Sequence, residues 1–149
     1  MNSNISSTLK SINSVAISDN ATQQICEEAA TFYEQKNYGA ALRLFYEAWL
    51  TLEKPQLEQK NAEIILSFIG DTYYQLAKYE PATEAFRSAL ACQKTGRRAF
   101  VLLRLGQALL DTNQEQQAKT YLQKAYRLGG KLLFEPEDKR YLNIIKELI

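Results

Sequence analysis

The chain has 149 residues, of which 46% are hydrophobic, and it carries a net charge of +1. This length and composition suit one folded domain and exclude a disordered chain, and no apolar run approaches the roughly 20 residues of a membrane-spanning helix. The absence of histidine removes the commonest general base and the commonest metal ligand. No nucleophile-elbow, phosphate-loop or dinucleotide-binding motif is present either. We therefore expect a cytoplasmic protein that is not an enzyme and needs no cofactor or metal.

The first 20 residues are rich in serine and asparagine. They lack the sustained apolar segment of a secretory signal, although they contain scattered apolar residues, namely Ile5, Leu9, Ile12, Val15 and Ile17. We expect residues 1–20 to form a polar arm, either partly helical or disordered, ahead of a single domain over residues 21–149.

A short phrase recurs three times, over residues 38–49, 79–90 and 114–126. In each copy a small, a large and a second small apolar residue follow at steps of four and three, which places them on one face of a helix. The three sets are Ala41, Phe45 and Ala48, then Ala82, Phe86 and Ala89, then Ala118, Leu122 and Ala125. Small side chains at these positions let a second helix come close.

A partner helix is predicted upstream of each phrase. A small residue stands about twelve residues before it and is followed three residues later by a larger apolar one; the pairs are Ala29 and Phe32, Gly70 and Tyr73, Gly106 and Leu109. Each unit is therefore a helix pair, and we place the units at about residues 22–55, 63–96 and 99–130. Repeated helix pairs stack into an all-α solenoid, a class of protein that binds other proteins or peptides.

The chain beyond the third unit is expected to cap this solenoid. Gly129 and Gly130 can adopt the positive φ that ends a helix, and Pro136 can open the next one. The predicted capping helix covers about residues 136–149, with an apolar stripe formed by Tyr141, Ile144, Ile145 and Leu148.

These residues resemble the tetratricopeptide repeat family, whose helix pairs carry a large-apolar, Gly or Ala, aromatic series followed by an Ala, Phe, Ala series. The resemblance implies a right-handed α-solenoid of three antiparallel helix pairs with a C-terminal capping helix. The spacing departs from the family's period of about 34 residues, because Ala82 follows Ala41 by 41 residues and Ala118 follows Ala82 by 36. We place the extra residues between units, around Glu53–Lys60 and Gln93–Arg98.

The resemblance also implies where a partner binds, because the first helices of tetratricopeptide units line the concave groove. The partner-binding residues that it nominates are Tyr33, Glu34, Phe68, Asp71, Tyr74, Gln75, Phe100, Arg104, Gln107 and Asp111, with Cys26, Ala30, Ile64, Ser67 and Leu103 beside them. Aromatic anchors of this kind carry much of the energy in interfaces. Family members that bind a C-terminal carboxylate use a clamp of Lys, Asn and Arg, and here only Arg104 is of a suitable type. A segment with an acidic element near Arg104 fits better than a carboxyl terminus.

Charge is unevenly divided. Residues 1–80 hold six basic and ten acidic side chains, whereas residues 81–149 hold twelve and seven. The basic half is either a surface for an acidic protein or nucleic acid, or a set of solvated helix faces; its residues include Lys94, Arg97, Arg98, Arg104, Lys119, Lys124 and Arg127. We do not expect nucleic acid to bind, because these charges lie on predicted amphipathic helices and no nucleic-acid motif accompanies them. Cys26 and Cys92 lack metal-ligand spacing and are expected to be free thiols.

Two functional classes follow for a protein made of repeats without an effector domain. The first is a dedicated neutralising or chaperoning partner, such as a bacterial toxin-immunity protein or a secretion chaperone, whose partner would be a toxin or secreted effector. The alternative is an assembly adaptor that links components of a larger complex. A dedicated partner binds one protein tightly, whereas an adaptor binds several.

Overall fold

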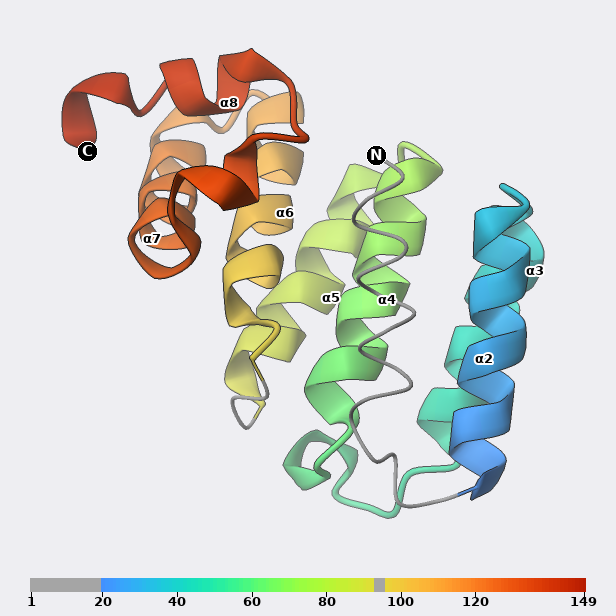
Figure 1. Cartoon of the computed structure of the whole chain (residues 1–149). Helices are drawn as coiled ribbons and strands as arrows, with labels where there is room; N and C mark the ends of the chain where they lie inside the picture. Colours follow the sequence, from blue (N-terminus) through green and yellow to red (C-terminus); the bar gives the residue numbers. More distant parts are fainter. Residues whose placement is uncertain (1–19, 93–95) are drawn as a thin grey trace.

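The structure is a computed structural model that describes residues 20–92 and 96–149 (Figure 1). The predicted arm falls outside the described residues, apart from Asn20, and so does Lys94. The helices are α2 (Asn20–Glu34), α3 (Tyr38–Leu50), α4 (Ala62–Gln75), α5 (Tyr79–Ala91), α6 (Arg98–Asp111), α7 (Glu115–Phe134) and α8 (Lys139–Asn143). The described residues contain no strand, and the helices pack as successive pairs. The prediction of an all-α solenoid of three helix pairs is confirmed.

The helix pairs pack closely at the glycines of the repeated pattern. A Cβ atom added to Gly70 would lie 2.6 Å from the ring of Phe86, and one added to Gly106 would lie 2.6 Å from Cγ of Leu122. The small and large residues of all three phrases are buried, from Ala41 to Ala125. The pattern therefore marks the contact between the two helices of a pair.

The three pairs also turn in the same way. Lys36, Ala77 and Asn113 each follow the first helix of their pair by two residues and adopt a positive φ of 60°, 57° and 62°. In the second pair the backbone N–H of Ala77 donates to the carbonyl of Tyr74, and the next N–H donates to that of Tyr73; the other two turns repeat this arrangement. This is the Schellman motif that ends many helices. The first pair is therefore built like the other two.

The C-terminal region differs in detail from the prediction. Gly130 adopts the expected positive φ of 69°, but one further helical turn follows it within α7. Helix α8 begins at Lys139 and not at Pro136, because the Asp138 side chain caps it by accepting a hydrogen bond from the N–H of Arg140.

The predicted capping helix is also shorter than expected. It ends at Asn143 and is followed by a 3₁₀ turn, η2 (Lys146–Leu148). Tyr141 and Ile145 are buried, but Leu148 is 46% exposed. Only part of the predicted apolar stripe therefore packs on α6 and α7.

The linker between the first two pairs contains a 3₁₀ turn, η1 (Gln56–Glu58). Its Gln56 side chain donates to the carbonyl of Trp49 over 3.0 Å and ties the linker to α3.

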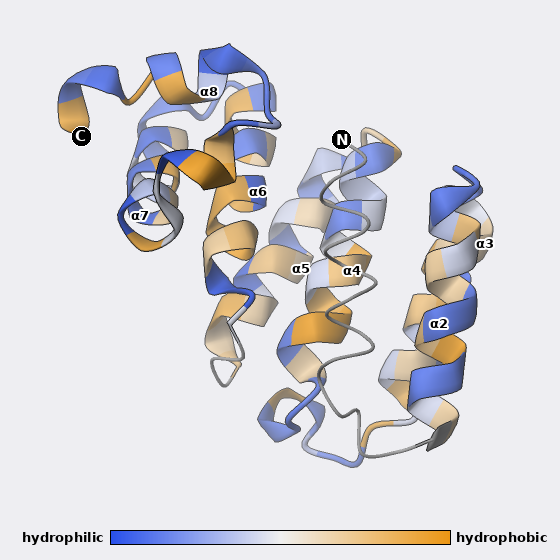
Figure 2. Cartoon of the chain, in the orientation of Figure 1, coloured by the Kyte–Doolittle hydropathy of each residue, from blue (hydrophilic) through white to orange (hydrophobic). Residues whose placement is uncertain are grey.

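Helices α4 and α6 are the most buried elements. Figure 2 shows apolar residues along much of both helices, and every residue from Ala62 to Thr72 and from Phe100 to Leu109 is buried. Polar side chains are among them, including Asp71, Arg104 and Gln107. Because a buried polar group is costly without a hydrogen-bond partner, their partners are of interest. None of the described helices is long and apolar enough to cross a membrane.

Candidate functional site

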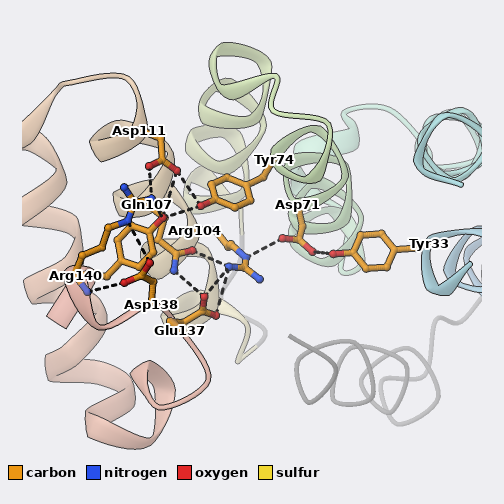
Figure 3. A network of polar contacts seen from close by, with 10 residues as sticks. Tyr33, Asp71, Tyr74, Arg104, Gln107, Asp111, Glu137, Asp138 and Arg140 are labelled. Atoms are coloured by element: carbon orange, nitrogen blue, oxygen red, sulfur yellow. Dashed lines mark hydrogen bonds and ion pairs between the residues drawn. The ribbon is translucent and has the colours of Figure 1, made fainter. Parts of the chain in front are cut away.

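Five polar side chains from four parts of the chain form one connected cluster, which we call the inner network (Figure 3). Its members are Tyr33 of α2, Asp71 of α4, Arg104 and Gln107 of α6, and Glu137 before α8. The Tyr33 hydroxyl donates to Oδ2 of Asp71 over 2.5 Å, and Nε of Arg104 donates to Oδ1 over 2.8 Å. The Asp71 carboxylate therefore joins all three helix pairs.

The other end of the inner network reaches the C-terminal region. Nη1 of Arg104 donates to Oε1 of Gln107 over 2.7 Å and lies 3.3 Å from Oε2 of Glu137. Nε2 of Gln107 donates to the same carboxylate oxygen over 3.0 Å. Arg104 is thus held between two carboxylates.

Burial and charge shift the pKa values within this network. Burial lowers the pKa of Arg104, but the carboxylates of Asp71 and Glu137 outweigh burial and raise it above its ordinary value. Burial also raises the pKa of Tyr33, and the adjacent Asp71 carboxylate raises it further. The guanidinium stays charged and the phenol stays protonated near neutral pH.

A second cluster, the rim network, lies beside the first and consists of Tyr74, Asp111, Arg140 and Tyr141. The Tyr74 hydroxyl donates to Oδ2 of Asp111 over 3.0 Å and lies 3.1 Å from the Tyr141 hydroxyl. Nη2 of Arg140 donates to Oδ1 of Asp111 over 2.6 Å. This network fastens α8 to the first helices of the second and third pairs.

Aromatic rings lie between the charged groups on this side of the molecule. The guanidinium of Arg104 lies 5.2 Å from the ring centre of Phe100 and 5.3 Å from that of Tyr74. That of Arg97 lies 4.5 Å from the ring centre of Phe100 and 5.5 Å from that of Phe68. Guanidinium groups favour the faces of aromatic rings. We call the side of α2, α4 and α6 that carries these rings and the inner network the A-helix face.

Arg97 differs from Arg104 in its hydrogen bonding. It is 9% exposed, and its Nε and Nη2 atoms have no hydrogen-bond partner in the described part of the chain. Burial lowers its pKa, and the carboxylates of Asp71 and Glu63 only partly offset that effect.

Most of the nominated partner-binding residues lie on the A-helix face. Six belong to the two networks, namely Tyr33, Asp71, Tyr74, Arg104, Gln107 and Asp111. Phe68 and Phe100 flank the arginines, whereas Glu34 is exposed and Gln75 is partly buried. The residues expected beside them, Cys26, Ala30, Ile64, Ser67 and Leu103, are buried.

Four residues of this region make contacts that the sequence did not predict. Glu137, Arg140 and Tyr141 were assigned to the capping helix alone, and Arg97 to a basic surface. The acidic, basic and aromatic run at residues 137–141 is a weak signal for a polar contact. Nothing in the local sequence marks Arg97 as buried.

The predicted basic half divides in two. Arg97 and Arg104 are buried and do not contribute to a basic surface. Arg98, Lys124 and Arg127 instead surround an open hollow of about 820 Å³ with an apolar floor of Leu90, Ala99, Leu102 and Leu128.

Metal ligands and thiols are sparse. No group of three or more His, Cys, Asp or Glu side chains that could hold a metal ion occurs among residues 20–92 and 96–149. Cys26 and Cys92 are free and buried, and burial, followed by the charge of Glu27, raises the pKa of Cys26 to about 12.

Comparison with known proteins identifies the repeat. A family model described as tetratricopeptide repeat matches residues 65–93 and 101–128, which lie in the second and third helix pairs. These two helix pairs are tetratricopeptide repeats. The shared turn at Lys36, Ala77 and Asn113 shows that the first pair is built in the same way.

A solved structure is similar over most of the chain. It is that of the type III secretion chaperone SycD from Yersinia enterocolitica, in complex with a peptide of the translocator YopD. The TM-score is 0.70, and the similarity covers 89% of this chain and 95% of that one at 15% sequence identity. At this identity the likeness concerns the fold. A search among curated proteins finds no match.

Proposed function

We propose that this tetratricopeptide repeat protein is a non-enzymatic chaperone that holds an extended segment of one partner protein along the A-helix face. The observation that supports the proposal most is the similarity, over nearly the whole length of both chains, to a chaperone solved with a bound peptide. The same similarity favours a chaperone over an immunity protein among the dedicated roles considered above.

The geometry of the A-helix face is consistent with this role. The hydrogen bonds that Tyr33 and Arg104 donate to Asp71 tie the three pairs together, and the rim network fastens α8 to them. A surface held in one arrangement loses little conformational entropy when a ligand binds. Tyr74, which is only partly buried, is of the type enriched in binding hot spots.

Site-specific photo-crosslinking in a native cell extract tests the proposal. A photoreactive phenylalanine analogue replaces Glu34 or Gln75, which adjoin the A-helix face without belonging to either network. A matched control carries it at Glu84, an exposed position of α5. We expect one dominant partner to crosslink from positions 34 and 75 and not from position 84.

Two outcomes would contradict the proposal. Equal crosslinking from Glu84, or crosslinking only from a probe at Arg127 beside the basic hollow, would place the partner on another surface. Several partners captured from positions 34 and 75 would favour the adaptor alternative.

A further inference from the structure

The basic hollow is a second surface of the chain, away from the A-helix face. It lies where the end of α5, the start of α6 and the middle of α7 meet, and its volume of about 820 Å³ is within the range of ligand sites in proteins. On α6 its lining residues are Arg98, Ala99 and Leu102, whereas Phe100 and Arg104 lie on the A-helix face. Residues four apart share a side of a helix and residues two apart do not. The basic hollow and the A-helix face are therefore separate surfaces.

The floor of the basic hollow is apolar and partly open to water. Leu102 is buried, Leu90 and Ala99 are partly buried, and Leu128 at the edge is 58% exposed. A concave apolar surface of this kind is typical of a binding site. A ligand that covers it gains free energy because apolar surface is removed from water.

Three cations surround this floor. Nη1 of Arg98 donates to the carbonyl of Leu90 over 3.1 Å, which fixes the guanidinium beside the end of α5. Lys124 and Arg127 are exposed and lie three residues apart, on one side of α7. None of the three cations forms an ion pair within the described part of the chain, and no acidic side chain is among the described residues that line the hollow. This local positive charge favours an anionic ligand.

The floor argues against nucleic acid as that ligand. Proteins that bind single strands stack the bases on aromatic rings. Tyr121, the aromatic residue that lines the hollow, already has Nζ of Lys124 at 5.4 Å and Cζ of Arg87 at 5.6 Å from its ring centre. Phosphates would pair with the cations, but the bases would meet leucine side chains.

An amphipathic helix matches both the floor and the cations, because it carries apolar side chains on one face and charged ones beside them. We propose that the basic hollow binds an amphipathic helix of a second protein. Its apolar side chains contact Leu90 and Leu128, and its Asp or Glu side chains pair with Arg98, Lys124 and Arg127. Together with the A-helix face, this surface gives the chain two separate binding sites, so the inference goes beyond the proposed function and does not depend on it.

Peptide binding to the full-length chain tests the inference. Dodecapeptides are selected from a random phage-displayed library on the wild-type chain and synthesised with a fluorescent label. Dissociation constants are measured by fluorescence polarisation for wild type, for the charge-reversal variant Lys124→Glu/Arg127→Glu and for Leu128→Gln. The matched control, Arg43→Glu/Lys60→Glu, also reverses one Arg and one Lys, at exposed positions outside the hollow. Circular dichroism checks that every variant keeps its helices.

We expect one class of selected peptides to bind wild type and the matched control equally within about twofold. The charge-reversal variant should bind this class at least about 10-fold more weakly, because two attractive pairs become repulsive. Leu128→Gln should weaken binding by about 10-fold, since an apolar contact is lost. Replacement of the Asp and Glu residues of these peptides by their amides should weaken binding to wild type but not to the charge-reversal variant, and added salt should weaken binding of the acidic forms.

Other results would overturn the inference. If no selected peptide distinguishes wild type from the charge-reversal variant and Leu128→Gln, the hollow is not a peptide site, and the proposed function stands, because its own test uses positions 34 and 75. A labelled single-stranded oligonucleotide that binds wild type but not the charge-reversal variant, in the absence of acidic peptides that do so, would make the hollow a nucleic-acid site. A wild-type dimer in analytical ultracentrifugation that the charge reversal dissociates would assign the hollow to a second copy of the chain.

Discussion

Replacing Arg104 with methionine should destabilise the protein more than any change on its surface. Arg104 is 3% exposed and lies 2.8 Å from Asp71 and 3.3 Å from Glu137. Methionine fills similar space but leaves two carboxylates in a poorly solvated site without their cation. Removal of one partner from a buried ion pair typically costs about 3–5 kcal/mol, a large share of the 5–15 kcal/mol that stabilises an average domain.

An exposed ion pair of equal length provides the comparison. Nζ of Lys119 lies 2.8 Å from Oε1 of Glu115, but the two side chains are 28% and 56% exposed. We expect Lys119→Met to cost less than about 0.5 kcal/mol, because water screens such pairs. The double variant Asp71→Leu/Arg104→Met removes one charge of each sign. Its loss of unfolding free energy should be at least about 2 kcal/mol smaller than the summed losses of the two single variants, because Arg104 and Asp71 interact directly.

Urea unfolding measures these effects with two probes. Far-ultraviolet circular dichroism reports all the helices, and the fluorescence of Trp49, the single tryptophan, reports the first pair. Since the inner network joins the three pairs, the two transitions should coincide in the wild type and separate in Arg104→Met. A loss from Arg104→Met below about 1 kcal/mol, comparable to that from Lys119→Met, would refute the assignment of the network as the link between pairs.

Three further predictions concern packing, turns and pH. Gly106→Ala should lower the free energy of unfolding by about 1–3 kcal/mol, because its Cβ would lie 2.6 Å from Cγ of Leu122 and 3.1 Å from the Leu122 backbone nitrogen. Gly39→Ala is the control: its Cβ would have no atom within 4 Å, and the same urea titration should show no loss of stability. Ala77→Gly should raise the free energy of unfolding by about 0.5–1 kcal/mol, because glycine relieves the positive φ of 57°, and a lower melting temperature would contradict this. Burial first, and then the Asp71 carboxylate, raises the folded-state pKa of Tyr33 above the ordinary 10.0. Its stabilising effect is therefore complete below pH 10 and declines by about 1.4 kcal/mol per pH unit above it, where only the unfolded chain ionises. Melting temperatures between pH 9 and 11 should consequently fall less steeply for Tyr33→Phe than for wild type, and parallel curves would contradict the assignment.

Most of the fold was predictable because its determinants are local. A helix that packs closely on its neighbour in sequence needs small residues beside a large one on the same face. The spacing of Ala82, Phe86 and Ala89 shows this pattern in the sequence. Glycines at positions 70 and 106 add that the approach is too close for a Cβ. Because each repeat packs only on its neighbours, the fold of a repeat protein can be predicted from a single sequence.

The start of the last helix was misplaced because its determinant is not local. Pro136 is a reasonable first residue of a helix, and the acidic residues after it suit a helix start. In the structure the Glu137 carboxylate is instead bound by Arg104 and Gln107, some thirty residues earlier. The chain turns into α8 only after this contact, and Asp138 provides the cap.

The site was predictable as a set of residues but not as a surface. In the repeat register the three residues lie at different positions: Tyr33 is four residues after Ala29, Asp71 is one after Gly70, and Arg104 is two before Gly106. The sequence therefore nominates each of them for the groove but does not predict that they meet. It does not show that their hydrogen bonds are made to one another. The exposure of a side chain depends on every element around it, as Phe68 illustrates: it is 2% exposed, with its ring centre 5.0 Å from that of Phe45. Truncation of Phe68 would therefore damage the core as well as any interface.

The two buried arginines differ in their hydrogen bonds and therefore in their roles. Arg104 has acceptors on α4, on α6 and before α8, so its hydrogen bonds stabilise the contacts between the repeats. Arg97 stacks on an aromatic ring that Arg104 also contacts, yet the donors of one of its edges remain unused. Both of these donor atoms are buried, so Arg97 makes fewer polar contacts than Arg104 although it lies at a similar depth. For that reason we expect Arg97→Met to cost less free energy of unfolding than Arg104→Met, because a buried guanidinium without acceptors contributes less to stability than one held between two carboxylates.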